Sequence, residues 1–110
     1  MTEPDGPVYE IAQLTIEPDD SQAFEEAVAQ AVPLFQRARG CRSMAVQASI
    51  EHPGRDLLVV AWDTVEDHMI HFRESVDFRL WRELTGPFFV EAPEVQHVRN
   101  TGMGFGPVGP

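Results

Sequence analysis

The sequence has a single cysteine, few basic residues and no long hydrophobic run. Cys41 alone can form neither an intrachain disulfide nor a multi-cysteine metal site. Eight lysine and arginine residues stand against 18 acidic residues, which gives a formal net charge of -10. Because nucleic acids and anionic membranes attract basic residues, we expect neither as a partner. The apolar run at residues 57–62 is far shorter than the roughly 20 residues that cross a bilayer.

The sequence also lacks the motifs of common cofactor sites and of secretion. It contains no glycine-rich phosphate loop and no dinucleotide fingerprint, so no nucleotide cofactor is expected. No GxSxG motif surrounds Ser75, which we interpret as a helix cap and not as a nucleophile. The first residues include neither a basic segment nor an apolar one, so we expect no signal peptide and predict a cytoplasmic protein.

The composition is that of one globular domain. Hydrophobic residues make up 43% of the chain and charged residues 24%, which is a balance that a folded domain of this length needs. Residues 1–7 are expected to form a flexible N-terminal tail, and residues 101–110 a C-terminal tail rich in glycine and proline. The single domain is therefore predicted to span residues 8–100.

Four segments show the patterns of β-strands. A β-branched and aliphatic segment predicts a first strand at residues 8–16, and alternation of apolar and polar residues predicts others at 44–50 and 94–99. The continuous apolar run at residues 57–62 is typical of a central strand. A turn at residues 52–56 joins the second and third strands into a hairpin.

A first helix is predicted between the first two strands. Asp20 or Ser21 caps its start, and Gly40 ends it. Pro33 lies inside the periodic segment and is expected to kink or split the helix. Steps of three and four residues predict one buried stripe, made of Phe24, Val28, Ala31, Phe35 and Ala38.

A second helical segment is predicted after the third strand. Residues 64–67 resemble a capping box, and Ser75 provides a second cap before the chain reaches Gly86. The first part is predicted to present one face made of Val65, His68, Met69 and Phe72. The second part carries the apolar residues Val76, Phe78, Leu80, Trp81 and Leu84.

The resulting β-α-β-β-α-β order is that of a ferredoxin-like split βαβ fold in the α+β class. It predicts a four-stranded antiparallel sheet with both helices on one face. The other face of such a sheet has no helix to cover it, and exposed apolar sheet is unfavourable in water. We therefore expect a homodimer that forms through the sheets.

Four segments of the second half, at residues 57–68, 72–82, 86–89 and 93–97, resemble the antibiotic biosynthesis monooxygenase family. The likeness extends over roughly residues 8–99, although the part before residue 57 matches only in its pattern of elements. The resemblance implies a dimeric α/β barrel with a pocket between each sheet and its helices.

Within the family, the resemblance is to the polyketide oxygenases at three site positions. Their strand-end tryptophan corresponds to Trp62, their pocket tyrosine to His68 and their helix arginine to Arg82. Their pocket asparagine corresponds to Leu58, so that part of the site is missing. Haem-degrading relatives require an asparagine, a tryptophan and a haem-ligating histidine, and we expect no haem degradation because the chain has Ala12, His71 and Trp81 at those positions.

The resemblance implies a monooxygenase that needs no metal, flavin or haem. Its substrate would be an electron-rich phenolic or polycyclic, polyketide-like molecule, which O₂ oxidises to a quinone. His68 is the predicted base, His97 a relay or alternative base, and Arg82 the cation beside the developing oxyanion. The predicted substrate slot consists of Trp62, Phe72, Phe78, Trp81 and Phe88.

Other interpretations of these residues stay open. A non-oxidative cyclase-like or small-ligand-binding barrel is favoured by Leu58, and an accessory dimer without small-molecule chemistry is a third reading. His68 could equally be an ordinary core histidine. His68 and His71 have a chelating spacing and His97 could approach them, but no carboxylate is clearly placed to complete a metal site, so none is expected.

Overall fold

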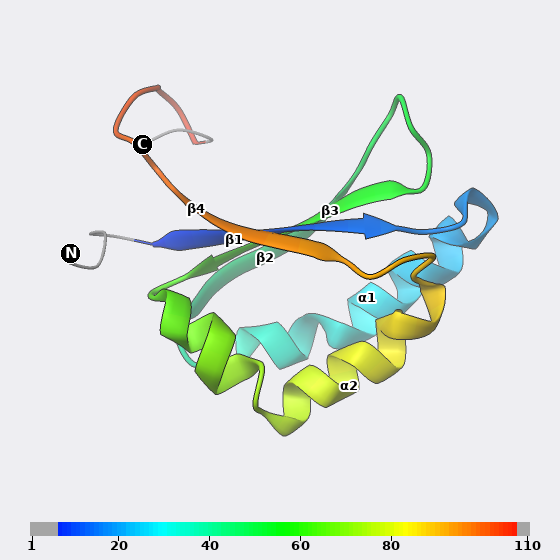
Figure 1. The fold of residues 1–110 in the computed structure, drawn as a ribbon, viewed down its shortest axis with the longest axis horizontal. Coiled ribbons are helices and arrows are strands. Elements are labelled where there is room, and N and C mark those ends of the chain that lie inside the picture. The colour runs from blue at the N-terminus through cyan, green and yellow to red at the C-terminus, as the bar shows by residue number, and fades with distance from the viewer. Residues whose placement is uncertain (1–6, 108–110) are drawn as a thin grey trace.

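Both helices of the chain lie on the same face of an antiparallel sheet (Figure 1). The computed structural model describes residues 7–107, so the expected N-terminal tail lies outside the described residues except for Pro7. Residues 101–107 contain neither helix nor strand. The elements in chain order are β1 (Val8–Thr15), a 3₁₀ turn (Pro18–Asp20), α1 (Ser21–Gln36), β2 (Cys41–Ala48), β3 (Arg55–Trp62), η2 (Asp67–Phe72), α2 (Val76–Thr85), η3 (Gly86–Phe88) and β4 (Glu94–Arg99).

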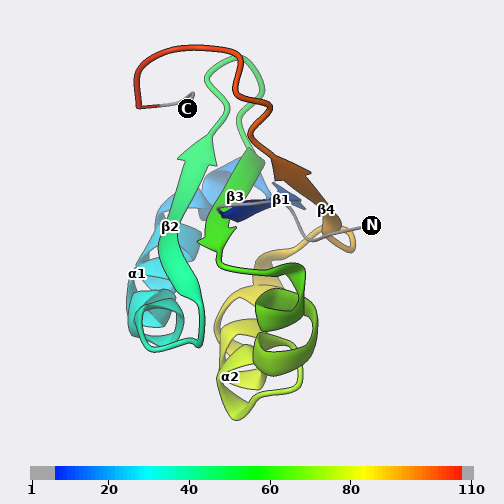
Figure 2. The same cartoon turned by 90° about the vertical axis from the view of Figure 1, so that its left-hand side faces the viewer.

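The strand order is β2-β3-β1-β4, and every neighbouring pair is antiparallel. This confirms the ferredoxin-like α+β fold, and Figure 2 shows the sheet above both helical segments. Strand β1 is central, so that Glu10 lies opposite Val60 of β3 on one side and opposite His97 of β4 on the other. The register thus brings residues from the two ends of the chain side by side.

Helix α1 runs through Pro33 and ends at Gln36 as one element, so the predicted split does not occur. Proline at position 33 lacks the N–H that would donate to the Ala29 carbonyl, and the loss of this one bond does not interrupt the helix. Four of the five predicted stripe residues are buried, namely Phe24, Val28, Ala31 and Phe35. Gly40 follows with a φ of 75°, and a Cβ at this position would overlap the Asp67 carboxylate, so only glycine fits this turn.

The segment after β3 is a π-helix over Asp67–Phe72 and not the α-helix that the periodicity predicts. The Thr64 hydroxyl accepts a hydrogen bond from the Asp67 N–H at 3.1 Å, so the hydroxyl half of the predicted capping box is present. The Arg73 N–H donates to the His68 carbonyl at 3.0 Å, which is the i to i+5 bond of a π-turn. This wider turn buries His68 but leaves Met69 38% exposed, so placing Met69 on the buried face is wrong.

Two further apolar residues are exposed where an element ends or begins. Ser75 caps α2 by accepting a hydrogen bond from the Phe78 N–H at 3.1 Å, as predicted. Val76, in the first turn beyond that cap, is 60% exposed. Strand β2 ends at Ala48, so Ile50 falls in the connection to β3 and is 90% exposed instead of buried.

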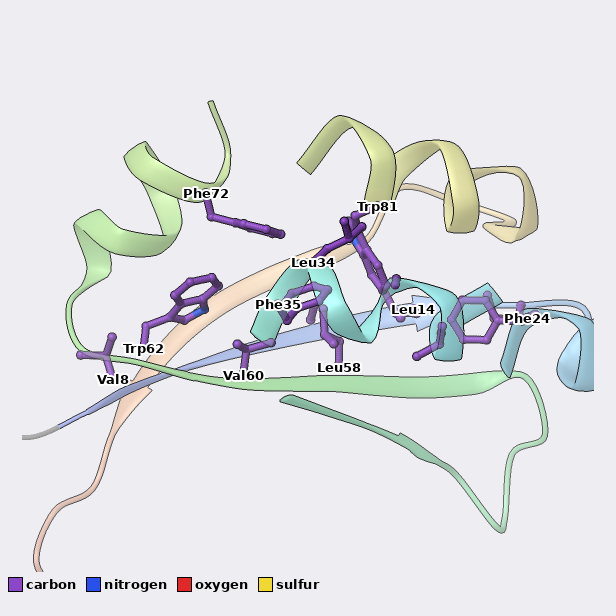
Figure 3. Close-up of a cluster of buried hydrophobic side chains, with 14 residues drawn as sticks. Val8, Leu14, Phe24, Leu34, Phe35, Leu58, Val60, Trp62, Phe72 and Trp81 are labelled. Atoms are coloured by element: carbon purple, nitrogen blue, oxygen red, sulfur yellow. The ribbon is translucent and has the colours of Figure 1, made fainter. Parts of the chain in front are cut away.

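The core fills the space between the sheet and the helical layer. In Figure 3 the Trp62 side chain from the sheet and the Phe35, Phe72 and Trp81 side chains from the helices point toward one another. The ring centroids of Phe35 and Trp81 are 5.1 Å apart and nearly perpendicular, and those of Trp62 and Phe72 are 5.4 Å apart. No helix in residues 7–107 is long and apolar enough to cross a membrane.

Candidate functional site

A cavity of about 570 Å³ lies between the helix-facing side of the sheet and α2. Its apolar wall includes Ala12, Leu14, Leu58, Phe78, Trp81 and Phe89. Its polar wall consists of Glu10, His68, Arg73, Arg82 and Glu91. An apolar cavity of this size with a few convergent polar groups is typical of a small-molecule site.

Glu10 is the most unusual of these polar residues, because it is a carboxylate on the buried face of a central strand. The side chain is 5% exposed and lies on the same face of β1 as Val8 and Ala12. Its Oε1 accepts a hydrogen bond from Trp62 Nε1 at 3.0 Å and lies 3.3 Å from His68 Nε2. Its Oε2 forms no hydrogen bond with the described residues. Because none of their fully buried side-chain oxygens lacks a partner, Oε2 keeps some contact with solvent, and we infer that this contact is with the cavity that Glu10 lines.

His68 is held on three sides. Its side chain is 3% exposed and stacks on the Trp62 ring, with centroids 5.4 Å apart and an interplanar angle of 17°. Its Nδ1 lies 2.8 Å from His97 Nε2, and its Nε2 faces Glu10. Both ring nitrogens therefore lie close to a polar partner, and the Nδ1 contact is a hydrogen bond.

Burial shifts the two ionisable groups in opposite directions. It raises the pKa of Glu10 to about 7, against the opposing effects of the Trp62 N–H and of the Arg73 charge. It lowers the pKa of His68 to about 4, and His97 and Arg73 act in the same direction. Near neutral pH the carboxyl group of Glu10 therefore gains and loses a proton while the His68 ring stays uncharged.

Four of the residues singled out from the sequence lie in the cavity wall: His68, Arg82, Phe78 and Trp81. His97 contacts His68 without entering the described wall.

Three other predicted slot residues lie outside the described wall. Trp62 is fully buried, Phe72 packs between Phe35 and Phe78, and the Phe88 ring lies 5.9 Å from that of Phe24. Phe89, and not Phe88, faces the cavity.

Sequence reasoning missed Glu10, whose carboxylate lies 3.3 Å from His68 Nε2. The available signal was its position: a strand that alternates Val8, Glu10, Ala12 and Leu14 puts an acid on the apolar face. Within residues 7–107, no group of three or more His, Cys, Asp and Glu side chains has the geometry to hold a metal ion.

Comparisons with known proteins agree with this fold. The model of the family described as antibiotic biosynthesis monooxygenase matches residues 7–84. YczJ of Bacillus subtilis (strain 168), an uncharacterised protein, is 33% identical over 93 residues, which cover 84% of this chain and 98% of YczJ.

Two solved structures named after the same family are also similar. The Bordetella bronchiseptica protein is 48% identical with a TM-score of 0.86, over 88% of this chain and 99% of that one. The Nitrosomonas europaea protein is 20% identical with a TM-score of 0.77, over 92% of this chain and 96% of that one, and shows the fold alone. By the family match and by these identities, the chain belongs to the antibiotic biosynthesis monooxygenase family.

Proposed function

We propose that the cavity binds an electron-rich phenolic or polycyclic substrate of polyketide type and that the protein oxidises it with O₂ to a quinone, without metal, flavin or haem. One observation carries the proposal: a buried carboxyl group with a pKa of about 7 opens onto an apolar cavity. A base that titrates near the working pH is well matched to removing a weakly acidic proton.

The reaction balances without an external reductant. In an anthrone-type substrate the base removes a proton from a CH₂ group, and the resulting carbanion passes electrons to O₂ and forms a hydroperoxide at that carbon. Loss of the second C–H proton and of hydroxide then leaves C=O and one molecule of water. The substrate loses four electrons and O₂ gains four, so one O₂ is consumed for each quinone.

Glu10 is the base in this proposal and His68 is the imidazole beside it, which revises the assignment made from sequence. Glu10 Oε2 keeps its contact with the cavity, whereas each nitrogen of His68 lies within 3.3 Å of a polar atom of the protein. Arg73 and Arg82 in the wall supply positive charge for the developing oxyanion. The rings of Phe78 and Trp81 give an aromatic substrate an apolar surface on which to stack.

The direct test supplies purified protein with an anthrone-type substrate after treatment with a chelator and without any reductant. We expect O₂ uptake and quinone formation in a one-to-one ratio, and a rate proportional to protein concentration. Oxygen electrode traces and absorbance of the quinone measure both. A rate no higher than that of the substrate in buffer alone, across a panel of anthrones and naphthols, would contradict the oxygenase proposal.

One observation favours a second, non-oxidative function. Leu58, which stands where the oxygenases resembled here have an asparagine, lies in the cavity wall and is 2% exposed. A site without that polar group would bind or cyclise an aromatic ligand without oxygenating it. In that case the anthrones and naphthols would bind and raise the melting temperature of the protein, but no O₂ would be taken up.

We also propose that the protein is a homodimer that forms through the uncovered face of the sheet. On that face Leu57 and Val98 are 39% and 41% exposed, and neither helix covers them. Sedimentation in dilute buffer is expected to give twice the 12.3 kDa chain mass. A folded species of 12.3 kDa would exclude the dimer, and Leu57→Glu is expected to shift the equilibrium toward monomer because it places a charge in the interface.

A further inference from the structure

We propose that Glu10, His68 and His97 form a proton relay that connects the buried cavity to the surface beside β4. Its catalytic consequence rests on the proposed oxygenase function, whereas its existence does not. Three elements supply the groups: Glu10 lies on β1, His68 on the π-helix and His97 on β4. The relay therefore exists only in the folded chain.

The geometry is a continuous line of close polar contacts, made of one hydrogen bond and one short N···O contact. Glu10 Oε1 lies 3.3 Å from His68 Nε2, and His68 Nδ1 lies 2.8 Å from His97 Nε2. Glu10 and His68 are both buried, whereas His97 is partly exposed. Since imidazole can bind a proton at one nitrogen and release one from the other, each histidine passes the proton on without moving.

The same two contacts fit two states that differ by one proton. With Glu10 ionised, His68 Nε2–H donates to Glu10 and His97 Nε2–H donates to His68 Nδ1. With Glu10 protonated, its O–H donates to His68 Nε2, His68 Nδ1–H donates to His97 Nε2, and His97 Nδ1 carries the additional proton. Conversion from the second state to the first passes the Glu10 proton to His68 Nε2, the His68 Nδ1 proton to His97 Nε2 and the His97 Nδ1 proton to solvent. One proton thus leaves the protein, and both rings are neutral at each end.

The surrounding charges favour this neutral route. Arg73 and Arg82 line the cavity, and the Arg73 charge opposes a positively charged His68 ring. The Glu91 carboxylate, also in the cavity wall, accepts a hydrogen bond from the Thr15 hydroxyl. Cys41 on β2 adds no charge near neutral pH, because burial raises the pKa of its thiol to about 11. Burial also lowers the pKa of His97, so this ring is uncharged at neutral pH as well.

The relay gives Glu10 a route to solvent that does not pass through the substrate. Glu10 Oε2 faces the cavity, and a bound aromatic molecule would separate it from bulk water. The proposed reaction requires Glu10 to take protons from carbon and to give them up again. Transfer through the two histidines resets Glu10 while the cavity is occupied.

The first test is ¹⁵N NMR of histidine-labelled protein without substrate. Between pH 5.5 and 8.5 we expect the protonated nitrogen of His68 to change from Nδ1 to Nε2 as Glu10 ionises, with no doubly protonated His68 ring. In Glu10→Gln the His68 signals are expected to stay constant over this range. A single unchanging tautomer in the wild-type protein, or a charged His68 ring, would overturn the relay.

The second test is kinetic and uses His97→Gln. Glutamine keeps a hydrogen-bonding group but cannot pass a proton on, so we expect kcat to fall by about tenfold, and added imidazole to restore part of the rate. This is less than the ~10²–10⁴-fold cost of removing a general base outright. His71→Gln, on the exposed side of the same π-helix, is the control and is expected to match the wild-type rate.

The two proposals can fail separately. If no substrate is oxidised but the His68 tautomer changes with Glu10, the relay stands and the oxygenase proposal falls. If anthrone is oxidised and His97→Gln keeps the full rate, the oxygenase proposal stands and the relay falls.

Discussion

Replacing Glu10 with glutamine is expected to lower the turnover of an anthrone-type substrate by roughly 10²–10⁴-fold, the usual range for loss of a general base. Glutamine has nearly the same shape and keeps an oxygen for the Trp62 N–H, so the fold should survive. The wild-type rate is expected to rise with pH through about 7, because only the ionised carboxylate of Glu10 accepts a proton. If His68 were the base, the rise would instead be centred near pH 4.

Stability gives a check on Glu10 that needs no substrate. The folded protein holds the Glu10 proton more tightly than the unfolded chain, whose carboxyl group has a pKa of about 4.5. The contribution of this bound proton to the free energy of unfolding is therefore fully present below pH 4.5 and is lost as the pH rises through about 7. Urea denaturation at several pH values measures this contribution. Between pH 5 and 8 we expect the free energy of unfolding to fall in the wild-type protein, and this fall to be absent in Glu10→Gln.

The matched control for Glu10→Gln is Glu83→Gln, on the exposed surface of α2. It makes the same chemical change outside the cavity, and we expect the wild-type rate and pH profile. Near-full activity in Glu10→Gln would show that the base lies elsewhere, and His68 would again be the first candidate.

Replacing Trp62 with alanine is expected to lower the free energy of unfolding by about 3–5 kcal/mol, the range for a large aromatic residue removed from a core. Trp62 is fully buried, and its ring lies against those of Phe72 and His68. Its indole N–H is also the hydrogen-bond donor to Glu10. The alanine variant thus leaves a cavity and a buried carboxyl group that has lost its donor.

Trp62→Phe separates these two effects. Phenylalanine retains most of the packing, so we expect a smaller loss of about 1–3 kcal/mol for the unpaired polar group. Because the indole N–H stabilises the carboxylate, its removal should raise the pKa of Glu10 and move the pH dependence of the rate to higher pH. Urea denaturation and the pH profile measure the two effects, and an unchanged profile would argue against the hydrogen bond.

The strands could be predicted well because the pattern that marks a strand can be recognised within a few consecutive residues. The last strand has the predicted bounds, Glu94–Arg99, and β3 extends the predicted residues 57–62 by two at its start. Ile50 was misplaced because the alternation continues past the hydrogen-bonded part of β2, and side chains alone do not show where pairing stops.

The candidate site was harder to predict because its parts meet only in the folded chain. The resemblance pointed to His68 and Arg82, which both line the cavity. Glu10 is 58 residues from His68 along the chain, and its contact with that histidine depends on how the π-helix packs against β1. Met69 was assigned to the wrong face because a period of 3.6 residues does not describe a π-turn.

The π-helix also affects how relatives of this protein should be compared with it. A π-turn contains one more residue than the α-turn that could replace it, so a related chain that is one residue shorter here can keep both ends of the segment in place. The residue aligned with His68 would then sit at a different angle around the helix. Equivalence at this position is therefore better judged by which side chain reaches the carboxylate of the first strand than by the aligned column.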